Sequence, residues 1–212
     1  MKELILIGGG GHCRACIDVI QANGSFRIIG IFDAPSNVGS SILGITVIGT
    51  DDEIEEYAKK GVGFHISIGG VKAFGLRKKI FEKLKSLNCD IPIIISSNAY
   101  VSQHAQLGQG TIVMHQAVVN ANAIVGENNI LNTQSLIEHD AVVGNNCHIS
   151  TKSTVNGTVK MGDNVYLGSN AALLNNIEIT NDTIIGASSV VIKSITQKGV
   201  YVGNPARMNK TV

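Results

Sequence analysis

Between Val101 and Thr196 the chain places an aliphatic residue at every sixth position. Sixteen consecutive six-residue units begin with Val, Leu, Ile or Met, and their fifth place is small or apolar nearly every time, with Asn129 as the exception. A period of six fits neither a helix, which repeats at about 3.6 residues, nor a lone strand, which alternates at two. It is typical of a parallel β-helix with three short strands in each coil, so that 18 residues complete one turn.

The residues before the repeat alternate between apolar runs and helical patterns. Residues 4–7 and 26–32 predict strands, and residues 14–22 between them predict a helix that ends at Asn23–Gly24. The expected buried face of this helix carries Ala15, Val19 and Ala22. The order strand, glycine-rich turn, helix, strand predicts a parallel βαβ unit.

Further elements are expected up to the start of the repeat. They are strands at 45–48, 64–68 and 91–95, a helix at 51–60 with Thr50 as its N-cap, and a helix at 71–87 with Leu76, Ile80 and Leu84 along its apolar stripe. The chain therefore divides near residues 96–98 into an α/β domain, 1–97, and an all-β domain, 98–212.

Composition narrows the functional classes. The 212 residues carry a net charge of +1 and no basic block, which argues against sequence-independent nucleic-acid binding. No apolar run approaches the roughly 20 residues that span a bilayer, and the N-terminus does not resemble a signal peptide, so a cytoplasmic location without membrane insertion is expected. Cys13 and Cys16 are expected to be small, partly buried thiols. The 24 glycines suit tight corners between flat faces.

Four consecutive glycines and His12 lie between the first predicted strand and its helix. Cys13 stands where the dinucleotide fingerprint G-x-G-x-x-G has its third glycine, which argues against a dinucleotide site. A single nucleoside diphosphate fits better, because backbone N–H groups at a helix start bind anions. Asp33, at the end of the second strand, is placed to bind a ribose or a base, and His12 could add a charge-assisted contact to phosphate. The alternative is that the glycines only permit a tight turn.

His139 differs from the other five histidines. It occupies the third place of its hexad, beyond the inward Ile137, and is flanked by Glu138 and Asp140. A carboxylate bound to one ring nitrogen holds the tautomer and raises the basicity of the other nitrogen. One coil further along is Gly157, about 4.8 Å away along the stack. The imidazole and a backbone N–H without a side chain can therefore flank one small reacting carbon.

The sequence has no motif for metal binding, for a serine nucleophile or for ATP hydrolysis. No set of His, Cys and carboxylate residues has the spacing of a metal site, so no metal is expected. No nucleophile elbow or phosphate-binding lysine loop is present, which disfavours a covalent serine mechanism and ATP hydrolysis.

Several stretches of the chain resemble one family of bacterial enzymes. They are residues 7–12, residues 68–69 before the basic run 77–79, residues 131–140 with His148, and residues 199–206. Over nearly all of its length the chain resembles the NeuD/PglD-like sugar acyltransferases. The resemblance implies an N-terminal Rossmann-like nucleotide-sugar-binding domain followed by a left-handed parallel β-helix with a C-terminal CoA-binding tail. It also implies a homotrimer with sites between neighbouring β-helices.

The resemblance implies a role for particular residues. His139 is expected to be the general base, Asp140 its carboxylate partner, and the Gly157 N–H the donor to the thioester carbonyl. The sugar nucleotide is expected to contact Gly10, Gly11, His12, Asp33, Gly69 and Asn132. Acetyl-CoA is expected to contact His148, Gly157, Ser169, Gly186, Ala187, Gly203, Pro205 and Arg207. The family often has a second acidic residue after the one at position 33, where this chain has Ala34.

The resulting hypothesis is N-acetylation, from acetyl-CoA, of a UDP-linked 4-amino-dideoxy sugar by direct attack of the amine. O-acetylation of a sialic-acid-type sugar would use the same base and stays open as an alternative. A non-catalytic trimeric scaffold is the alternative from another class, and a nucleotide-dependent oxidoreductase is the weakest candidate.

Overall fold

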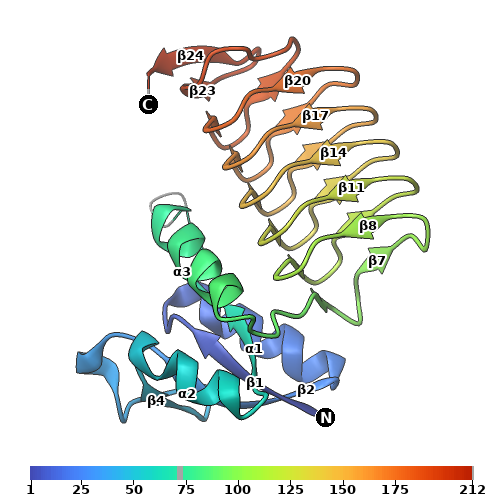
Figure 1. Cartoon of the computed structure of the whole chain (residues 1–212). Helices are drawn as coiled ribbons and strands as arrows, with labels where there is room; N and C mark the ends of the chain where they lie inside the picture. Colours follow the sequence, from blue (N-terminus) through green and yellow to red (C-terminus); the bar gives the residue numbers. More distant parts are fainter. Residues whose placement is uncertain (71–73, 212) are drawn as a thin grey trace. The chain divides into compact units, whose positions relative to one another are not determined.

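The chain forms two compact units, Met1–Ser97 (unit 1) and Asn98–Val212 (unit 2), each of which has its own fold (Figure 1). The computed structural model describes residues 1–70 and 74–211. Across these described residues, no helix has both the length and the apolar character needed to cross a membrane.

Unit 1 is a five-stranded sheet with helices. Its elements are β1 (Lys2–Ile7), α1 (Gly11–Asn23), β2 (Phe26–Phe32), the 3-10 turn η1 (Pro35–Asn37), β3 (Ser41–Ile42), β4 (Ile45–Gly49), the 3-10 turn η2 (Asp51–Glu53), α2 (Ile54–Lys59), β5 (Gly63–Ile66), α3 (Phe74–Ser86) and β6 (Ile94–Ile95). The sheet order is β3-β4-β2-β1-β5. Because β1 pairs in parallel with both β2 and β5, the predicted βαβ unit is confirmed. The short β3 is antiparallel to β4.

The buried face of α1 differs from the expectation. The helix buries Cys13, Cys16, Ile17, Val19 and Ile20, whereas Ala15 and Ala22 are exposed. The larger aliphatic side chains and the two thiols are buried in preference to the alanines, because their burial removes more apolar surface from water. Burial raises the pKa of both thiols, so Cys13 and Cys16 are inert packing residues.

Two other expectations in unit 1 also need correction. On α3, Ile80 and Leu84 are buried as expected, whereas Leu76 is 52% exposed and Arg77 and Phe81 complete the buried face. The strand expected at 91–95 is reduced to β6, two residues long. The expected helix start at 71 lies outside the described residues. Thr50 does cap the next element, in a capping box with Glu53.

Unit 2 is the expected parallel β-helix, and it is left-handed. Its strands are β7 (Tyr100–Val101), β8 (Gln106–Leu107), β9 (Ile112–Val113), β10 (Val118–Val119), β11 (Ile124–Val125), β12 (Ile130–Leu131), β13 (Leu136–Ile137), β14 (Val142–Val143), β15 (His148–Ile149), β16 (Thr154–Val155), β17 (Lys160–Met161), β18 (Tyr166–Leu167), β19 (Ala172–Leu173), β20 (Glu178–Ile179), β21 (Ile184–Ile185) and β22 (Val190–Val191). Every third strand pairs in parallel, as Val119 does with Ile137, so each coil takes 18 residues and the strands stack (Figure 1).

The corners of the coil are built differently from the expectation. The fourth place of the hexad, not a glycine after the aliphatic residue, adopts the left-handed conformation, as at Asn122, Asp140 and Asn176. Asn and Asp tolerate this region better than other residues with a side chain. The glycines at the second place permit close stacking instead, because a Cβ on Gly144 would lie 2.6 Å from the carbonyl carbon of Gly162.

The exceptional Asn129 also has a structural reason. It is fully buried, its Nδ2 donates to the Gly144 carbonyl at 2.9 Å, and its Oδ1 accepts from the Cys147 N–H at 2.6 Å. The side chain thus satisfies backbone groups inside the coil, as buried polar groups must be satisfied.

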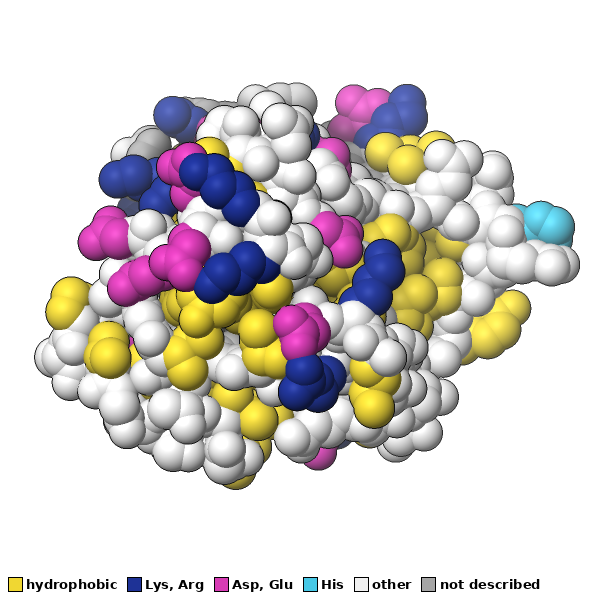
Figure 2. Space-filling model, turned by 60° about the horizontal axis from the view of Figure 1, so that its bottom comes forward, with side chains coloured by type: hydrophobic (Ala, Val, Ile, Leu, Met, Phe, Trp, Pro, Cys, Tyr) yellow, Lys and Arg dark blue, Asp and Glu magenta, His cyan; other side chains and the backbone are white. Residues whose placement is uncertain are grey.

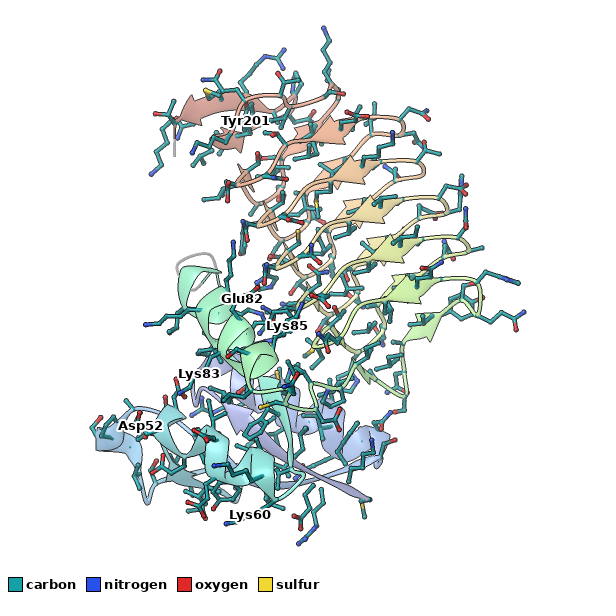
Figure 3. All side chains as sticks on the ribbon, in the orientation of Figure 1. Asp52, Lys60, Glu82, Lys83, Lys85 and Tyr201 are labelled. Carbon is teal, nitrogen blue, oxygen red and sulfur yellow. The ribbon has the colours of Figure 1, made fainter. Side chains whose placement is uncertain are left out.

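The chain leaves the hexad register after residue 196, as expected. Strand β23 (Val200–Val202) pairs in parallel with β21 and forms an antiparallel hairpin with β24 (Arg207–Lys210). Tyr201, labelled in Figure 3, lies in this hairpin and donates its hydroxyl proton to the Gln197 carbonyl at 2.8 Å. The hairpin covers the last coil.

Candidate active site

His139 lies outside the coil, on the corner that joins β13 to β14. Its side chain is 59% exposed, and its Nδ1 lies 2.8 Å from Oδ2 of Asp140. The other carboxylate oxygen of Asp140 accepts from Nδ2 of Asn122 at 2.7 Å. The carboxylate of Glu138 accepts from the backbone N–H of His139. The corner therefore presents a chain of three hydrogen-bonded side chains that ends in an imidazole.

The charges on this corner set the state of the imidazole. The hydrogen bond to Asp140 raises the pKa of His139 above its usual value, and the charges of Asp140 and Glu138 act in the same direction. The hydrogen bonds from Asn122 and His139 lower the pKa of Asp140. An ionised carboxylate can only accept a hydrogen bond, so Nδ1 of His139 must donate it and carries the hydrogen. Nε2 of neutral His139 therefore keeps its lone pair.

Gly157 lies directly beside that lone pair, one coil further along. A Cβ on Gly157 would sit 2.9 Å from both Cε1 and Nε2 of His139, so only glycine leaves this space open. The two coils are tied by the Thr158 N–H, which donates to the His139 carbonyl at 3.1 Å. Within the described residues the Gly157 N–H donates no hydrogen bond of its own. The expected juxtaposition of an imidazole and a bare backbone amide is present.

Asn132 and His148 form a second group, two hexads apart in sequence order. Asn132 Nδ2 lies 3.3 Å from His148 Nε2, and the His148 ring packs edge-on against Tyr166 at 5.2 Å between centroids. His148 is 7% exposed and lies on the strand β15. The pair therefore offers polar atoms on a largely buried surface.

The remaining expected site residues of unit 2 do not lie on the corner of His139. Asn132, Ser169, Gly186 and Ala187 all lie on the corner that enters the sheet of β13, β16, β19 and β22, whereas His139 and Gly157 lie on the corner that leaves it. Gly203, Pro205 and Arg207 lie in and beside the terminal hairpin, where Gly203 donates to Ser189 Oγ at 3.0 Å. Within one chain, the residues on the corner of His139 and those on the corner of Ser169 are therefore separated by the sheet between them.

The glycine turn of unit 1 lines a cavity of about 270 Å³ at the N-terminus of α1. Its walls are Gly8–Gly11, His12, Asp33, Ser67, Ile68, Gly69 and Leu76. Gly10 is the N-cap of α1 and carries no side chain, so the first helical N–H groups are open to a ligand. Five of the residues expected to bind the sugar nucleotide thus share one cavity.

His12, for which the sequence suggested a charge-assisted contact to phosphate, lines this cavity as a neutral imidazole. It is largely buried beneath Gly69, whose Cβ would lie 2.9 Å from the imidazole Cγ. Burial, and then the charge of Arg77, lower the pKa of His12 to about 4. The imidazole is therefore neutral at pH 7. His65, on β5, is fully buried, and its pKa is lowered by burial and then by the charges of Arg77 and His12.

Arg77 is the cation behind this turn. It is 4% exposed, and its guanidinium donates to the carbonyls of Ile66 and Ile68, with burial lowering its pKa to about 10. The family-like basic run 77–79 thus contributes one buried charge beneath the glycine turn. Such a charge adds to the positive potential at the helix N-terminus.

A second cavity of about 320 Å³ adjoins the first and was not expected from the sequence. It shares Gly8, Asp33, Ile68 and Leu76 with the first cavity and continues to Ala34, Pro35 and Thr50–Asp52 over an apolar floor. Burial raises the pKa of Asp51, and the Lys83 ammonium donates to the Asp51 carbonyl at 2.6 Å. Asp52 and Lys83 are labelled in Figure 3. The acidic side chain absent at Ala34 is replaced here by two from η2.

The described residues contain no group of three or more His, Cys, Asp or Glu side chains that could hold a metal ion. On the face shown in Figure 2, basic and acidic side chains are interspersed in small groups.

These features define a class: a hexapeptide-coil transferase with a nucleotide-type N-terminal domain. Residues 3–84 match the model of the PglD N-terminal domain, and residues 158–193 match the bacterial transferase hexapeptide model. A comparison with curated protein sequences found no match.

Solved structures match over the whole chain. PerB from Caulobacter crescentus, in complex with CoA and GDP-perosamine, is 30% identical, with 99% of this chain and 98% of that chain covered and a TM-score of 0.90. The acetyltransferase domain of PglB from Neisseria gonorrhoeae is 27% identical (98% and 100% covered, TM-score 0.91). WeeI from Acinetobacter baumannii, at 21% identity, shares the fold (98% and 100% covered, TM-score 0.87). The chain belongs to the NeuD/PglD-like sugar acyltransferases and is an enzyme of that class.

Proposed function

We propose that this enzyme transfers the acetyl group of acetyl-CoA to the amine of a nucleotide-linked amino sugar, with His139 as the general base. The observation that carries the proposal is the position of His139 Nε2, which faces the open space over Gly157 on the outside of the coil. The perosamine enzyme and the PglB domain support the same class of reaction, since CoA or acetyl-CoA is present in their complexes.

The chemistry follows from these groups. The amine nitrogen attacks the thioester carbonyl carbon while His139 Nε2 accepts its proton, and the carbonyl electrons move to oxygen. The Gly157 N–H donates to that oxygen as charge develops. The C–S bond then breaks, and the proton on His139 neutralises the departing CoA thiolate. Asp140 keeps the imidazolium stable between the two proton transfers.

The two adjoining cavities of unit 1 are proposed to hold the nucleotide. The helix N-terminus at Gly10 and Gly11 offers N–H groups to a diphosphate, and Asp33 lies between the two cavities, where a ribose or base edge would reach it. The hypothesis from the sequence names UDP, whereas the complex of the perosamine enzyme contains GDP-perosamine. Calorimetric titration with UDP, GDP and CMP decides between them.

A homotrimer is proposed because the site residues occupy two corners. The sheet between these corners has a mostly apolar outer surface, formed by Tyr100, Val118, Leu136, Thr154, Ala172 and Val190. Packing this sheet around a three-fold axis would bring the His139 corner of one protomer to the Ser169 and Gly186 corner of the next. Acetyl-CoA would then lie in the water-poor cleft between two coils.

The proposal is tested by incubating the protein with acetyl-CoA and a panel of UDP-, GDP- and CMP-linked sugars, each in an amino and a hydroxy form. Free thiol release and the mass of the sugar product are followed together. The expected result is thiol release with an amino sugar and a product heavier by one acetyl group. Acetylation of the hydroxy sugar alone would replace the proposal with O-acetylation, and failure to bind acetyl-CoA would replace it with a scaffold role.

A further inference from the structure

The corner that carries His139 holds a third residue at the same place of the hexad. His139, Gly157 and Asn175 are spaced by 18 residues each, so they stack on three successive coils at about 4.8 Å per coil. Asn175 lies in the turn after β19 and is exposed. Gly157, which lies between them in the stack, has no side chain that could contact the imidazole of His139 or the side-chain amide of Asn175.

The side chains of His139 and Asn175 converge on one point. A Cβ on Gly157 would lie 2.9 Å from His139 Nε2 and 3.2 Å from Asn175 Nδ2. The same open space over Gly157 is therefore bounded on one side by a proton acceptor and on the other by a side-chain N–H donor.

We propose that Asn175 is a catalytic residue, whose side-chain amide donates a hydrogen bond to the acetyl oxygen of the thioester alongside the Gly157 N–H. This inference rests on the proposed function, because it takes acetyl-CoA as the occupant of the space over Gly157. Two donors at one oxygen stabilise the charge that develops there more than they stabilise the neutral thioester. His139 acts on the opposite side, where the amine loses its proton, and Asn175 only donates a hydrogen bond.

The alternative role for Asn175 is uniform binding of CoA. An amide at this position could instead hold a polar group of the pantetheine arm with equal strength before and during the reaction. The kinetic signatures of the two roles differ. A donor to the developing oxyanion affects kcat, whereas a uniform contact affects KM for acetyl-CoA.

The test replaces Asn175 by Ala and by Asp in the full-length enzyme, with Q103A as the matched control. Gln103 occupies the same hexad place on the same corner two coils before His139 and is exposed, so its loss is expected to leave the kinetics unchanged. N175A is expected to lower kcat about 10²-fold with little change in KM for acetyl-CoA. A normal kcat in N175A, or a raised KM at normal kcat, overturns the proposal.

N175D provides a readout that does not depend on activity. A carboxylate at this place faces His139 and is expected to raise the imidazole pKa, measured by NMR from the Cε1 proton of the ligand-free protein, while N175A and Q103A leave it unchanged. An unchanged pKa in N175D contradicts the juxtaposition itself. If the wild-type enzyme acetylates no sugar of the panel although N175D shifts the pKa, the proposed function fails and the arrangement of the corner stands.

Discussion

Unit 1 has no internal repeat, and its different strands and helices pack around one core. In unit 2 the same two-residue strand recurs coil after coil. The cavity of unit 1 is made from backbone at Gly8–Gly11 and is supported from beneath by His12, His65 and Arg77, which are also packing residues. In unit 2 the inward place of every hexad supplies the core, whereas on the corner after β13 the third place carries the exposed His139. Binding and stability are therefore coupled in unit 1, while in unit 2 chemistry can change without disturbing the scaffold.

The largest expected effect tests this separation at His139. H139A is expected to lower kcat by about 10²–10⁴-fold, because general-base assistance is lost. The melting temperature is expected to stay the same, since the side chain is exposed and packs on nothing inward. Steady-state kinetics and calorimetry on the same preparation measure both quantities. H104A, which removes another exposed histidine of unit 2, is the control and keeps its activity. Unfolding of H139A would contradict the separation.

Two glycines sharpen the same point inside unit 2. In G157A the new methyl lies 2.9 Å from the His139 imidazole, which can turn away, so kcat is expected to fall about 10²-fold while the fold survives. In G144A the new methyl meets the backbone of the next coil, which cannot move, so about 1–3 kcal/mol of stability is expected to be lost. Urea unfolding and kinetics of the two variants check this contrast. Equal loss of stability in both would show that corner and scaffold are not separable.

The same contrast explains what the sequence could predict. Residue n + 18 lies over residue n throughout the coil, so one period placed Gly157 beside His139, and it would also have placed Asn122 beside Asp140 had the offset been followed in both directions. In unit 1 each face is determined by a single helix and its neighbours. The burial of Cys16 in place of Ala15 depends on which side chains the sheet accepts. The neutral state of His12 depends first on its burial and then on Arg77, 65 residues away, and no local pattern reveals either.

An acid titration is expected to destabilise unit 1 through its two buried histidines. The pKa of His12 is about 4 in the folded chain and about 6.5 when unfolded, so the unfolded state binds more protons between these values. Stability is therefore lost as the pH falls below 6.5, by about 3 kcal/mol at pH 4 from His12, and His65 acts in the same direction. Hydrogen exchange at pH 7.5, 6 and 5 resolves the two units. Equal loss of protection in unit 2 would contradict this prediction, and H65L is expected to reduce the dependence.

The smallest expected effect concerns the corner residue that serves both scaffold and site. Asp140 has a φ of +60°, which asparagine also tolerates, so D140N is expected to keep the coil intact. Because only neutral His139 accepts a proton, kcat/KM is expected to rise with pH and level off above a pKa higher than 6.5. In D140N the carboxylate that raises this pKa is gone, so the rise moves to lower pH while the plateau falls roughly tenfold through the weaker base. A pH profile of kcat/KM measures both changes, and a rise that stays in place would mean that Asp140 serves only the corner.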